Sequence, residues 1–540
     1  MPETNTPSTV YSSFLAAARE HPGRPFLKVL SETAEAYGIE SGEHSYGAML
    51  EQVKGRAGEF ESAGYGRGHR VGLLLENRPE FFVNWFALNA LGASVVPINP
   101  DLKEADLAYL IGHSEQTLCI ATAGRVSDVE AAIQSGGAKA VAIAPGDDVP
   151  IVSEPADAGS PDAGTEAALL YTSGTTGLPK GCVLNNSYFL HTADWYAQLG
   201  GYCRLGRAGE RMLTPLPLFH MNAMACSTMA MITCRGCLTV LDRFHPDSWW
   251  ASVKESAATI VHYLGVMPPL LMQAAPSARD TDHRVRFGFG AGVDMGLHAP
   301  FEERFGFPLI EAWAMTETGM GAVVVASEEP RRVGTRCFGK PGPEVEIKLV
   351  DEDGADVPAG TPGELLVRQA GDDPRYGFFN RYLKDDEATA EAWRGGWFHT
   401  GDVVLRNGDG TLVFVDRKKN VIRRSGENIS AVEVENTISR HDDVQAIAVA
   451  AVPDQVRGDE VFACIVPTGA GGEAHAEDLV RWCLTQLAYY KAPGYISYVD
   501  EIPVTATNKI QRSGVKELAG ELFAKGAFVD TRHLKKRNPG

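Results

Sequence analysis

The sequence predicts an α/β protein with a large N-terminal domain and a small α+β C-terminal domain. The chain has 540 residues, which is too long for one hydrophobic core, so several domains or subdomains are expected. In residues 45–120, and again in residues 212–320, apolar residues at helical spacing alternate with short buried runs. This alternation is typical of mostly parallel sheets covered by helices. We therefore expect two α/β subdomains within an N-terminal domain of residues 1–415.

The first subdomain begins with residues 45–64, whose apolar side chains recur at helical spacing. The elements expected after that helix are a strand at residues 70–75, a helix at 81–91 and a strand at 93–98. Residues 145–164, which are rich in Pro, Asp, Ala and Gly, indicate a linker or surface excursion. The strands expected in the second subdomain lie at residues 213–218, 238–241, 259–263, 286–290 and 309–310.

The pattern then changes to short strands separated by Gly, Pro and Asp turns. This change, over residues 334–414, predicts a small β-barrel or β-sandwich. A basic run directly after a strand, residues 416–419, marks the expected domain boundary. Residues 420–524 alternate helix and strand and predict the small α+β domain. The polar, basic tail of residues 525–540 is expected to be mobile, and no function is assigned to it.

Composition indicates which binding partners, cellular location and cysteine chemistry to expect. The net charge of −19 leaves no basic excess to neutralise phosphates, so a nucleic acid is not an expected partner. No apolar run is long enough for a membrane span, and residues 1–24 lack the pattern of a signal peptide, so we expect a cytoplasmic location. Among the nine cysteines, Cys234 and Cys237 form one C-x-x-C without a second pair at zinc spacing. Buried, reduced thiols are therefore expected.

One loop, residues 171–181, reads YTSGTTGLPKG and follows an apolar run that predicts a buried strand. Hydroxyls, glycine-exposed N–H groups and a lysine together form a cradle for phosphate oxygens. The residues of this cradle are Thr172, Ser173, Gly174, Thr175, Thr176, Gly177 and Lys180. Because Gly181 rather than Ser or Thr follows the lysine, the loop is not a Walker A motif, and we expect a loop that closes on a triphosphate. A flexible surface loop is the alternative that composition alone leaves open.

Three later stretches carry single reactive side chains. Residues 312–319 offer an aromatic ring and Glu317, a carboxylate of the kind that Mg²⁺ takes beside phosphates; a solvated glutamate is the alternative. Asp402 follows an expected strand and can accept both hydroxyls of a ribose, or else belongs to a β-turn. Lys509 stands in a loop near the C-terminus, where a lone exposed lysine is usually only a solvated charge.

Together and in this order, these stretches resemble the core motifs of the adenylate-forming superfamily, which includes acyl-CoA synthetases, luciferases and peptide-synthetase adenylation domains. The resemblance covers about residues 45–516. The matching motifs stand at residues 171–181, 216–220, 313–319, 397–402, 416–435, 490–493 and 509–512. Within the superfamily, the chain is most similar to the crotonobetaine/carnitine–CoA ligase branch, through residues 267–269 and 424–433.

The resemblance implies a two-step ligase with a mobile C-terminal domain. A carboxylic acid and ATP, with Mg²⁺, would give an acyl-adenylate and pyrophosphate. The acyl group would then pass to the thiol of coenzyme A, with release of AMP. Two alternatives remain: an adenylating enzyme that loads a carrier protein or oxidises its adenylate, and a nucleotide-binding relative without catalysis. A homodimer is an open alternative to a monomer.

The resemblance also implies a role for each matching residue. The catalytic residues would be Lys509, Thr316, Glu317 and His220, and Glu317 would also hold the metal. Besides the loop residues Thr172 to Lys180, ATP would be bound by Gly290, Ala291, Gly292, Trp313, Asp402 and Arg417. Rotation at a hinge, Lys419, would bring in the coenzyme A turn, Ser425, Gly426 and Glu427. The acyl pocket would be formed by His220, Met221, Asn222, His262, Met267 and Ala314.

Four positions depart from the family pattern. Trp313 stands where Tyr is usual, which keeps the stacking surface, and Ala314 replaces a Gly on the acyl side. Ser425 and Asn508 each replace a Gly, which affects the coenzyme A turn and the loop of Lys509 without removing a catalytic group. Since Ala314 adds a methyl and several pocket residues are bulky and polar, we expect a short or compact acid with some polarity.

Overall fold

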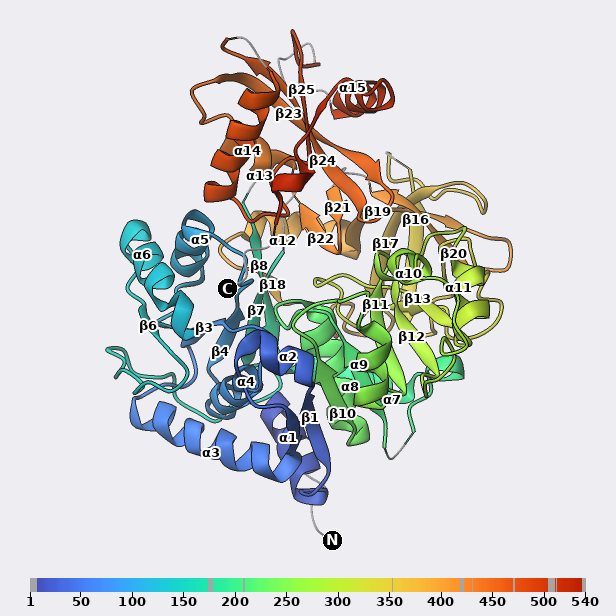
Figure 1. Ribbon diagram of the computed structural model, residues 1–540. Coiled ribbons are helices and arrows are strands. Elements are labelled where there is room, and N and C mark those ends of the chain that lie inside the picture. Colours follow the sequence, from blue (N-terminus) through green and yellow to red (C-terminus); the bar gives the residue numbers. More distant parts are fainter. Residues whose placement is uncertain are drawn as a thin grey trace.

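The computed structural model describes residues 7–172, 178–206, 209–351, 353–417, 422–429, 431–469, 472–503, 510 and 512–536. It confirms the α/β class, with a large N-terminal domain and a smaller C-terminal domain. In Figure 1 the C-terminal domain lies above the two α/β subdomains. The N-terminal domain contains three sheets, and the C-terminal domain contains a fourth.

The first subdomain is a seven-stranded sheet in the order β18-β8-β7-β4-β3-β5-β6. Its strands are β3 (Arg70–Leu74), β4 (Ser94–Pro97), β5 (Leu118–Ala121), β6 (Val141–Ile143), β7 (Glu166–Thr172), β8 (Lys180–Asn185) and β18 (Arg381–Tyr382). The helices of this part are α3 (Tyr46–Ser62), α4 (Pro79–Leu91), α5 (Glu104–Ser114), α6 (Val126–Gly136) and α7 (Asn186–Gln198). Strands β3 to β7 run parallel, as expected for buried apolar runs joined by helices, and β8 returns antiparallel beside β7.

The second subdomain is an eight-stranded sheet in the order β14-β13-β12-β11-β9-β10-β1-β2. Its strands are β1 (Pro25–Val29), β2 (Gly42–Ser45), β9 (Arg211–Thr214), β10 (Cys237–Val240), β11 (Ile260–Leu264), β12 (Phe287–Ala291), β13 (Leu309–Trp313) and β14 (Val324–Val325). Its helices are α1 (Val10–Glu20), α2 (Ser31–Tyr37), a π-helix (Asn222–Ser227), α8 (Thr228–Cys234), α9 (Trp249–Ser256), α10 (Met267–Met272) and α11 (His298–Phe305). Strands β1 and β2, near the N-terminus, complete this sheet rather than the one that follows them in sequence.

Where the sequence predicts a small β-barrel or sandwich, the structure has a five-stranded antiparallel sheet in the order β15-β20-β19-β17-β16. Its elements are β15 (Cys337–Gly339), β16 (Val345–Val350), β17 (Gly363–Gln369), β19 (Phe398–Arg406) and β20 (Leu412–Arg417), with α12 (Asp386–Ala392) nearby. Because β20 continues to Arg417, the predicted boundary begins within the last strand of this sheet.

The C-terminal domain has a six-stranded sheet flanked by three helices. Its elements are β21 (Ile422–Arg424), β22 (Glu427–Ile429), α13 (Ala431–Ile438), β23 (Val444–Asp454), β24 (Gly458–Pro467), α14 (Glu473–Gln486), β25 (Tyr495–Tyr498), α15 (Arg512–Ala524) and β26 (Val529–Asp530). In place of a mobile tail from residue 525, β26 pairs antiparallel with β25, and a 3₁₀ turn (Arg532–Leu534) follows.

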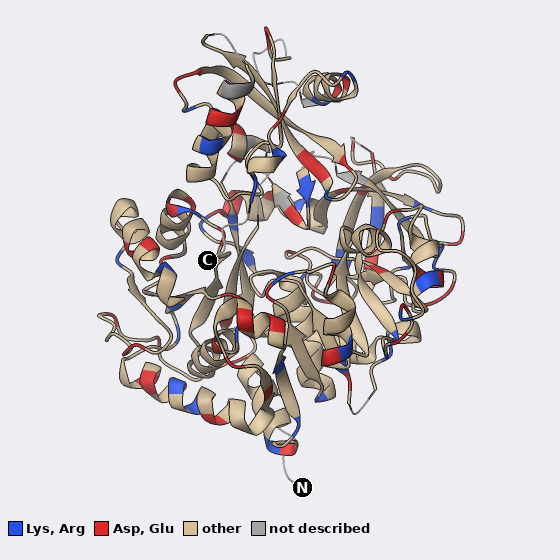
Figure 2. Ribbon diagram, in the orientation of Figure 1, with Lys and Arg blue, Asp and Glu red and all other residues tan. Residues whose placement is uncertain are grey.

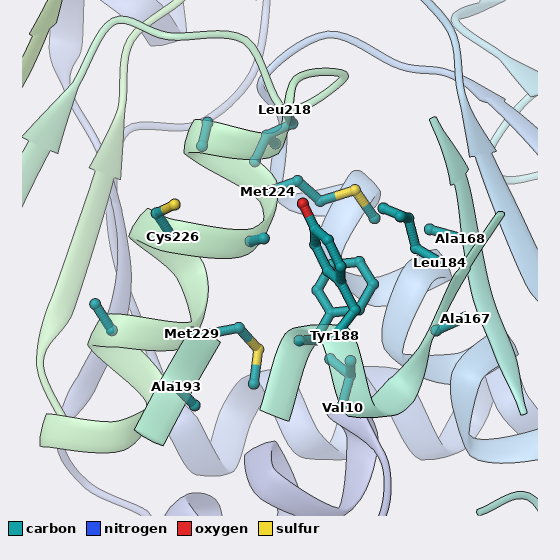
Figure 3. Packing of buried hydrophobic residues seen from close by; sticks show 14 of the residues in the cluster. Val10, Ala167, Ala168, Leu184, Tyr188, Ala193, Leu218, Met224, Cys226 and Met229 are labelled. Atoms are coloured by element: carbon teal, nitrogen blue, oxygen red, sulfur yellow. The ribbon is translucent and has the colours of Figure 1, made fainter. Parts of the chain in front are cut away.

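Separate cores support the two domains. One buried cluster joins all three N-terminal sheets, and in it Tyr188 of α7 packs among Ala167 and Leu184 of the first subdomain and Met224 and Met229 of the second (Figure 3). The buried clusters of the C-terminal domain contain only residues of that domain. All nine cysteines are free and buried, which confirms the expectation of reduced thiols.

Charged residues are coloured on the ribbon in Figure 2. Acidic and basic residues are interspersed along the helices and strands in the view of Figure 2. Within the described ranges, no helix combines the length and apolarity that crossing a bilayer requires.

Gly265 and Gly292 lie in the loops after β11 and β12, at neighbouring positions in the sheet register. A methyl group at Gly265 would overlap the backbone carbonyl of Gly292, which has no side-chain freedom to move away. We expect Gly265→Ala to lower the free energy of unfolding by about 1–3 kcal/mol. Gly112→Ala is a matched control in α5, because nothing lies near its added methyl, and should raise stability by about 0.5–1 kcal/mol. Urea unfolding measures both, and equal effects would argue against the crowding at Gly265.

Candidate functional site

A cavity of about 910 Å³ opens where the two α/β subdomains meet the C-terminal domain. Ligand sites of open α/β sheets lie outside the carboxyl ends of the parallel strands, and β7, β11 and β13 all end here. Its lining includes residues from both domains: Asp106, Thr172, Lys180, His220, Met221, Asn222, Leu264, Ala314, Thr316, Glu317, Tyr382, Gly426, Glu427 and Lys491.

The two ends of the predicted phosphate loop lie opposite one another at the cavity. Thr172 ends β7, Lys180 begins β8, and the two residues pair across the strands. The Nζ of Lys180 lies 3.1 Å from Oδ2 of Asp385 and 5.0 Å from the ring centre of Tyr382. The intervening loop residues, Ser173, Gly174, Thr175, Thr176 and Gly177, lie outside the described residues.

Glu317 connects the two subdomains beside the ends of the predicted phosphate loop. Its Oε1 accepts hydrogen bonds from the Thr172 hydroxyl at 3.4 Å and the Tyr382 hydroxyl at 3.0 Å. Burial and the neighbouring Glu317 carboxylate raise the pKa of Tyr382, so its hydroxyl stays a donor at neutral pH. The preceding residue, Thr316, is held through its backbone carbonyl, which accepts a 3.0 Å bond from the Tyr188 hydroxyl.

The predicted nucleoside residues form a second group. The indole N–H of Trp313 donates to Oδ2 of Asp402 at 2.9 Å, and both side chains are buried. Asp402 in β19 pairs with Arg417 in β20 through the backbone; the structure does not describe the Arg417 side chain.

Gly290 and Ala291 end β12, and the loop that begins at Gly292 is held by a residue that the sequence did not single out. Glu311 in β13 accepts hydrogen bonds from the N–H groups of Gly292 at 2.9 Å and Val293 at 2.8 Å. Burial raises the pKa of this carboxyl group. Glu311 therefore gives the loop after β12 one defined position beside Trp313.

The predicted acyl residues divide into two layers. His220, Met221, Asn222 and Ala314 line the cavity, together with Leu264. His262 and Met267 are absent from the lining. Met267, at the start of α10, is buried in a separate cluster of the second subdomain.

His262 lies fully buried behind Asn222. Its Nδ1 is 2.7 Å from Oδ1 of Asn222, and its Nε2 is 3.1 Å from the Tyr196 hydroxyl. Burial lowers the pKa of His262 to about 3, so the ring is neutral and carries one proton. Since the Asn222 oxygen is an acceptor, Nδ1 carries that proton and the Tyr196 hydroxyl donates to Nε2. The amide nitrogen of Asn222 then remains to donate to a ligand in the cavity.

The C-terminal domain closes the cavity with the predicted coenzyme A turn. Ser425 and Gly426 have positive φ angles of 52° and 88°, and a methyl at Gly426 would collide with the side chain of Leu264. The next residue, Glu427, places Oε2 3.4 Å from Nε2 of His220. The predicted hinge Lys419 and the predicted catalytic Lys509 lie outside the described residues.

Further contacts join the two domains beside this turn. The Asn99 amide donates to the Tyr490 hydroxyl at 2.9 Å. Lys491 forms an ion pair with Glu433 and lies 3.7 Å from Asp106 of α5. These contacts hold the C-terminal domain where its turn of Ser425, Gly426 and Glu427 lies against Leu264 and His220.

Among the residues of the site that the sequence did not single out, three hold other site residues in place. Tyr382 lies in a two-residue strand, Glu311 lies inside an apolar strand, and Tyr188 lies in an ordinary helix. A charged residue within an otherwise apolar buried strand is the one signal that was available, and it applies to Glu311.

The chain is similar in sequence to known AMP-binding enzymes along most of its length. A family model described as AMP-binding enzyme matches residues 14–376, and one described as AMP-binding enzyme C-terminal domain matches residues 433–509. A crotonobetaine/carnitine–CoA ligase of Escherichia coli O7:K1 is 31% identical over 494 residues, which cover 88% of this chain and 93% of that protein.

Two solved structures share the fold. A double mutant of o-succinylbenzoate CoA synthetase from Bacillus subtilis, bound with a product analogue, has a TM-score of 0.78 at 22% identity and covers 94% of this chain and 98% of its own. A malonyl-CoA ligase with methylmalonyl-CoA and AMP bound has a TM-score of 0.72 at 26% identity and covers 89% of this chain and 96% of its own.

The neutral state of His262 has a measurable consequence for stability. The ordinary pKa of the residue is 6.5 and burial lowers it to about 3, so below pH 6.5 only the unfolded chain takes up the proton. Stability should therefore fall as the pH drops from about 6.5, by up to about 1.4 kcal/mol per pH unit from this residue. The variant His262→Gln removes that part of the slope. Urea unfolding of both proteins between about pH 7 and pH 4.5 measures it, and parallel curves would contradict a neutral buried ring.

Proposed function

This chain belongs to the AMP-binding enzyme family, and from that membership and the arrangement of the cavity we propose that it is an AMP-forming acyl-CoA ligase. The reaction joins a carboxylic acid to coenzyme A and converts ATP to AMP and pyrophosphate. The observation that carries the proposal is that one cavity is lined both by Thr172, Lys180, Thr316 and Glu317, which are expected to act on the phosphates of ATP, and by Gly426 and Glu427 of the turn expected to bind coenzyme A. An acyl group can then pass from one cosubstrate to the other without leaving the site.

In the first step, the acid carboxylate attacks the α-phosphate of ATP and pyrophosphate leaves. Two anions must approach, so catalysis depends on positive charge and hydrogen-bond donors placed around the phosphates. We assign the β- and γ-phosphates to the loop from Thr172 to Lys180, and the α-phosphate to Thr316. Lys509 would lie between the carboxylate and the α-phosphate.

Glu317 fits Mg²⁺ by its chemistry, because it is a buried carboxylate beside hydroxyl donors at the mouth of the phosphate loop. Magnesium would neutralise phosphate charge when bound. Trp313 and the loop from Gly290 to Gly292 would hold the adenine, and Asp402 with Arg417 would hold the ribose. The hydrogen bond between Trp313 and Asp402 links these two tasks.

In the second step, the coenzyme A thiol attacks the acyl carbon and AMP leaves. Rotation at Lys419 would exchange the loop of Lys509 for the turn of Ser425, Gly426 and Glu427. The described position of this turn, against Leu264 and His220, suits this second step. His220, paired with Glu427, would close the acyl pocket on the side where the thiol arrives.

The acid is proposed to be short or compact and to carry a polar group. Ala314 and His220 both line the cavity, and we expect the Ala314 methyl and the His220 ring to limit the length of the bound acid. Met267 lies in a separate buried cluster, whereas His262 contacts Asn222 from behind the lining and would orient it so that its amide nitrogen can donate to the acid. A cytoplasmic location and a homodimer remain predictions.

The first test is a panel of acids scored by AMP release. We expect AMP to form only when acid and coenzyme A are both present, with the highest kcat/KM for compact polar acids. Ala314→Gly should raise kcat/KM for longer straight-chain acids about tenfold or more, because one methyl against a fixed wall costs about 1–3 kcal/mol. Pyrophosphate exchange without coenzyme A turnover would instead indicate transfer to another acceptor, and ATP binding without exchange would indicate a protein without catalysis. A preference of the parent enzyme for long-chain acids would contradict the compact pocket.

A second test concerns Lys509. We expect Lys509→Ala to lower acid-dependent pyrophosphate exchange by about 10²–10³, because the lysine neutralises charge only in the first transition state. Supplied with pre-formed acyl-adenylate and coenzyme A, the same variant should form thioester at nearly the parent rate. An equal loss of both steps would show that the assigned role is wrong.

A further inference from the structure

Three charged side chains meet in the interior of the C-terminal domain. The Nε of Arg424 lies 2.9 and 2.8 Å from the two carboxylate oxygens of Glu460, and Nζ of Lys535 lies 2.5 Å from Oε1 of the same residue. Their side chains are 1%, 0% and 0% exposed. Burial and the nearby Arg424 lower the pKa of Lys535 to about 7.

This network differs from ordinary ion pairs on a protein surface because all three charged side chains are buried. Removing charges from water costs several kcal/mol per ion, so a buried ion cluster is weak evidence for stability. Its best-attested use is to specify one arrangement of the surrounding chain. The position of Arg424 in the chain indicates what is specified here.

Arg424 is the last residue of β21, directly before the turn of Ser425, Gly426 and Glu427. Arg424 pairs with Gly458 of β24, and the Ser425 N–H donates to the Arg457 carbonyl at 2.9 Å. Beyond the turn, Gly426 lies against Leu264, and Glu427 faces His220. A displacement of Arg424 would therefore move the turn relative to the acyl pocket.

Lys535 reaches this network from the far end of the chain. Residues 529–536, which we call the C-terminal strap, begin with β26 beside β25. The hydroxyl of Thr531 donates to the Pro493 carbonyl at 2.9 Å, and Arg532 lies 3.1 Å from Asp454. Gly494 leaves room for the Glu460 carboxylate, which a methyl at that position would overlap. The strap is thus fixed directly before Lys535 by the pairing of β26 and by the contacts of Thr531 and Arg532.

We propose that Lys535 is a positioning residue for thioester formation: through Glu460 and Arg424, the C-terminal strap sets the turn of residues 425–427 against the acyl pocket. This proposal rests on the proposed function. The C-terminal strap thereby has a role in the reaction, whereas the sequence alone predicts only a polar, basic tail there. Adenylation should not need Lys535, because that step uses Lys509 and the residues of the N-terminal domain.

The test compares two adjacent lysines. Lys535→Met keeps the length of the side chain and removes the donor to Glu460, whereas Lys536→Met changes an exposed lysine one position away. Pyrophosphate exchange reports the first step, and coenzyme A consumption from pre-formed acyl-adenylate reports the second. We expect Lys535→Met to keep exchange within about twofold and to lower thioester formation about tenfold or more, since small misplacements near a reacting group can cost up to about 10²-fold. Lys536→Met should match the parent in both.

A conservative variant separates positioning from simple loss of structure. Lys535→Gln keeps an N–H donor for Glu460, so it should lose less thioester formation than Lys535→Met while exchange again stays near the parent value. Unchanged thioester formation in Lys535→Met, or a parallel loss of both steps through unfolding or otherwise, overturns the proposal. If the parent enzyme itself forms no thioester, the proposed function fails and this inference fails with it.

Discussion

The hydrogen bonds to Glu317 are the contacts on which the arrangement of the cavity depends. The residue follows β13 of the second subdomain, whereas Thr172 and Tyr382, which donate to its carboxylate, belong to the first. The Phe379 N–H also donates to the backbone carbonyl of Glu317 at 2.9 Å, so side chain and main chain both join the subdomains. Because a buried carboxylate is costly without partners, the two sheets are constrained to present their carboxyl ends to the same space.

Other buried polar side chains around the cavity also form hydrogen bonds that fix neighbouring residues. Glu311 holds the loop after β12 through two N–H groups, Tyr188 holds the carbonyl of Thr316, and the neutral ring of His262 holds the Asn222 oxygen. Tyr188 and His262 thereby act one layer behind Thr316 and Asn222, which line the cavity. Thr316 and Asn222 are thereby oriented before any ligand binds. Such preorganisation is the condition for strong electrostatic stabilisation of a transition state.

Ion pairs connect the parts of the C-terminal domain. At its boundary, Lys491 pairs with Glu433 and approaches Asp106, which holds this domain against α5. In its interior, Glu460 joins Arg424 to the C-terminal strap. The proposed exchange of partners between two half-reactions needs contacts that can separate. Lys491 and Glu433 are both buried at this boundary, and Asp106 lies across it from Lys491. The fully buried network instead keeps the turn within the domain in one shape.

The sequence by itself determined the α/β class, the order of the subdomains and the residues that stand in the phosphate, nucleoside and coenzyme A motifs, since these depend on local spacing and residue type. Every role predicted for a site residue remains a prediction from sequence, and Lys509, Lys419 and the residues from Ser173 to Gly177 also lie outside the described residues. Only the tertiary structure decided that Tyr382 meets Glu317, that His262 lies behind Asn222 and not on the cavity wall, and that Lys535 is buried. The physical reason is that these contacts join residues far apart in the chain, which sheet order and register bring together. The local sequence around a lysine in a polar tail is the same whether its ammonium group is hydrated or paired with a buried carboxylate.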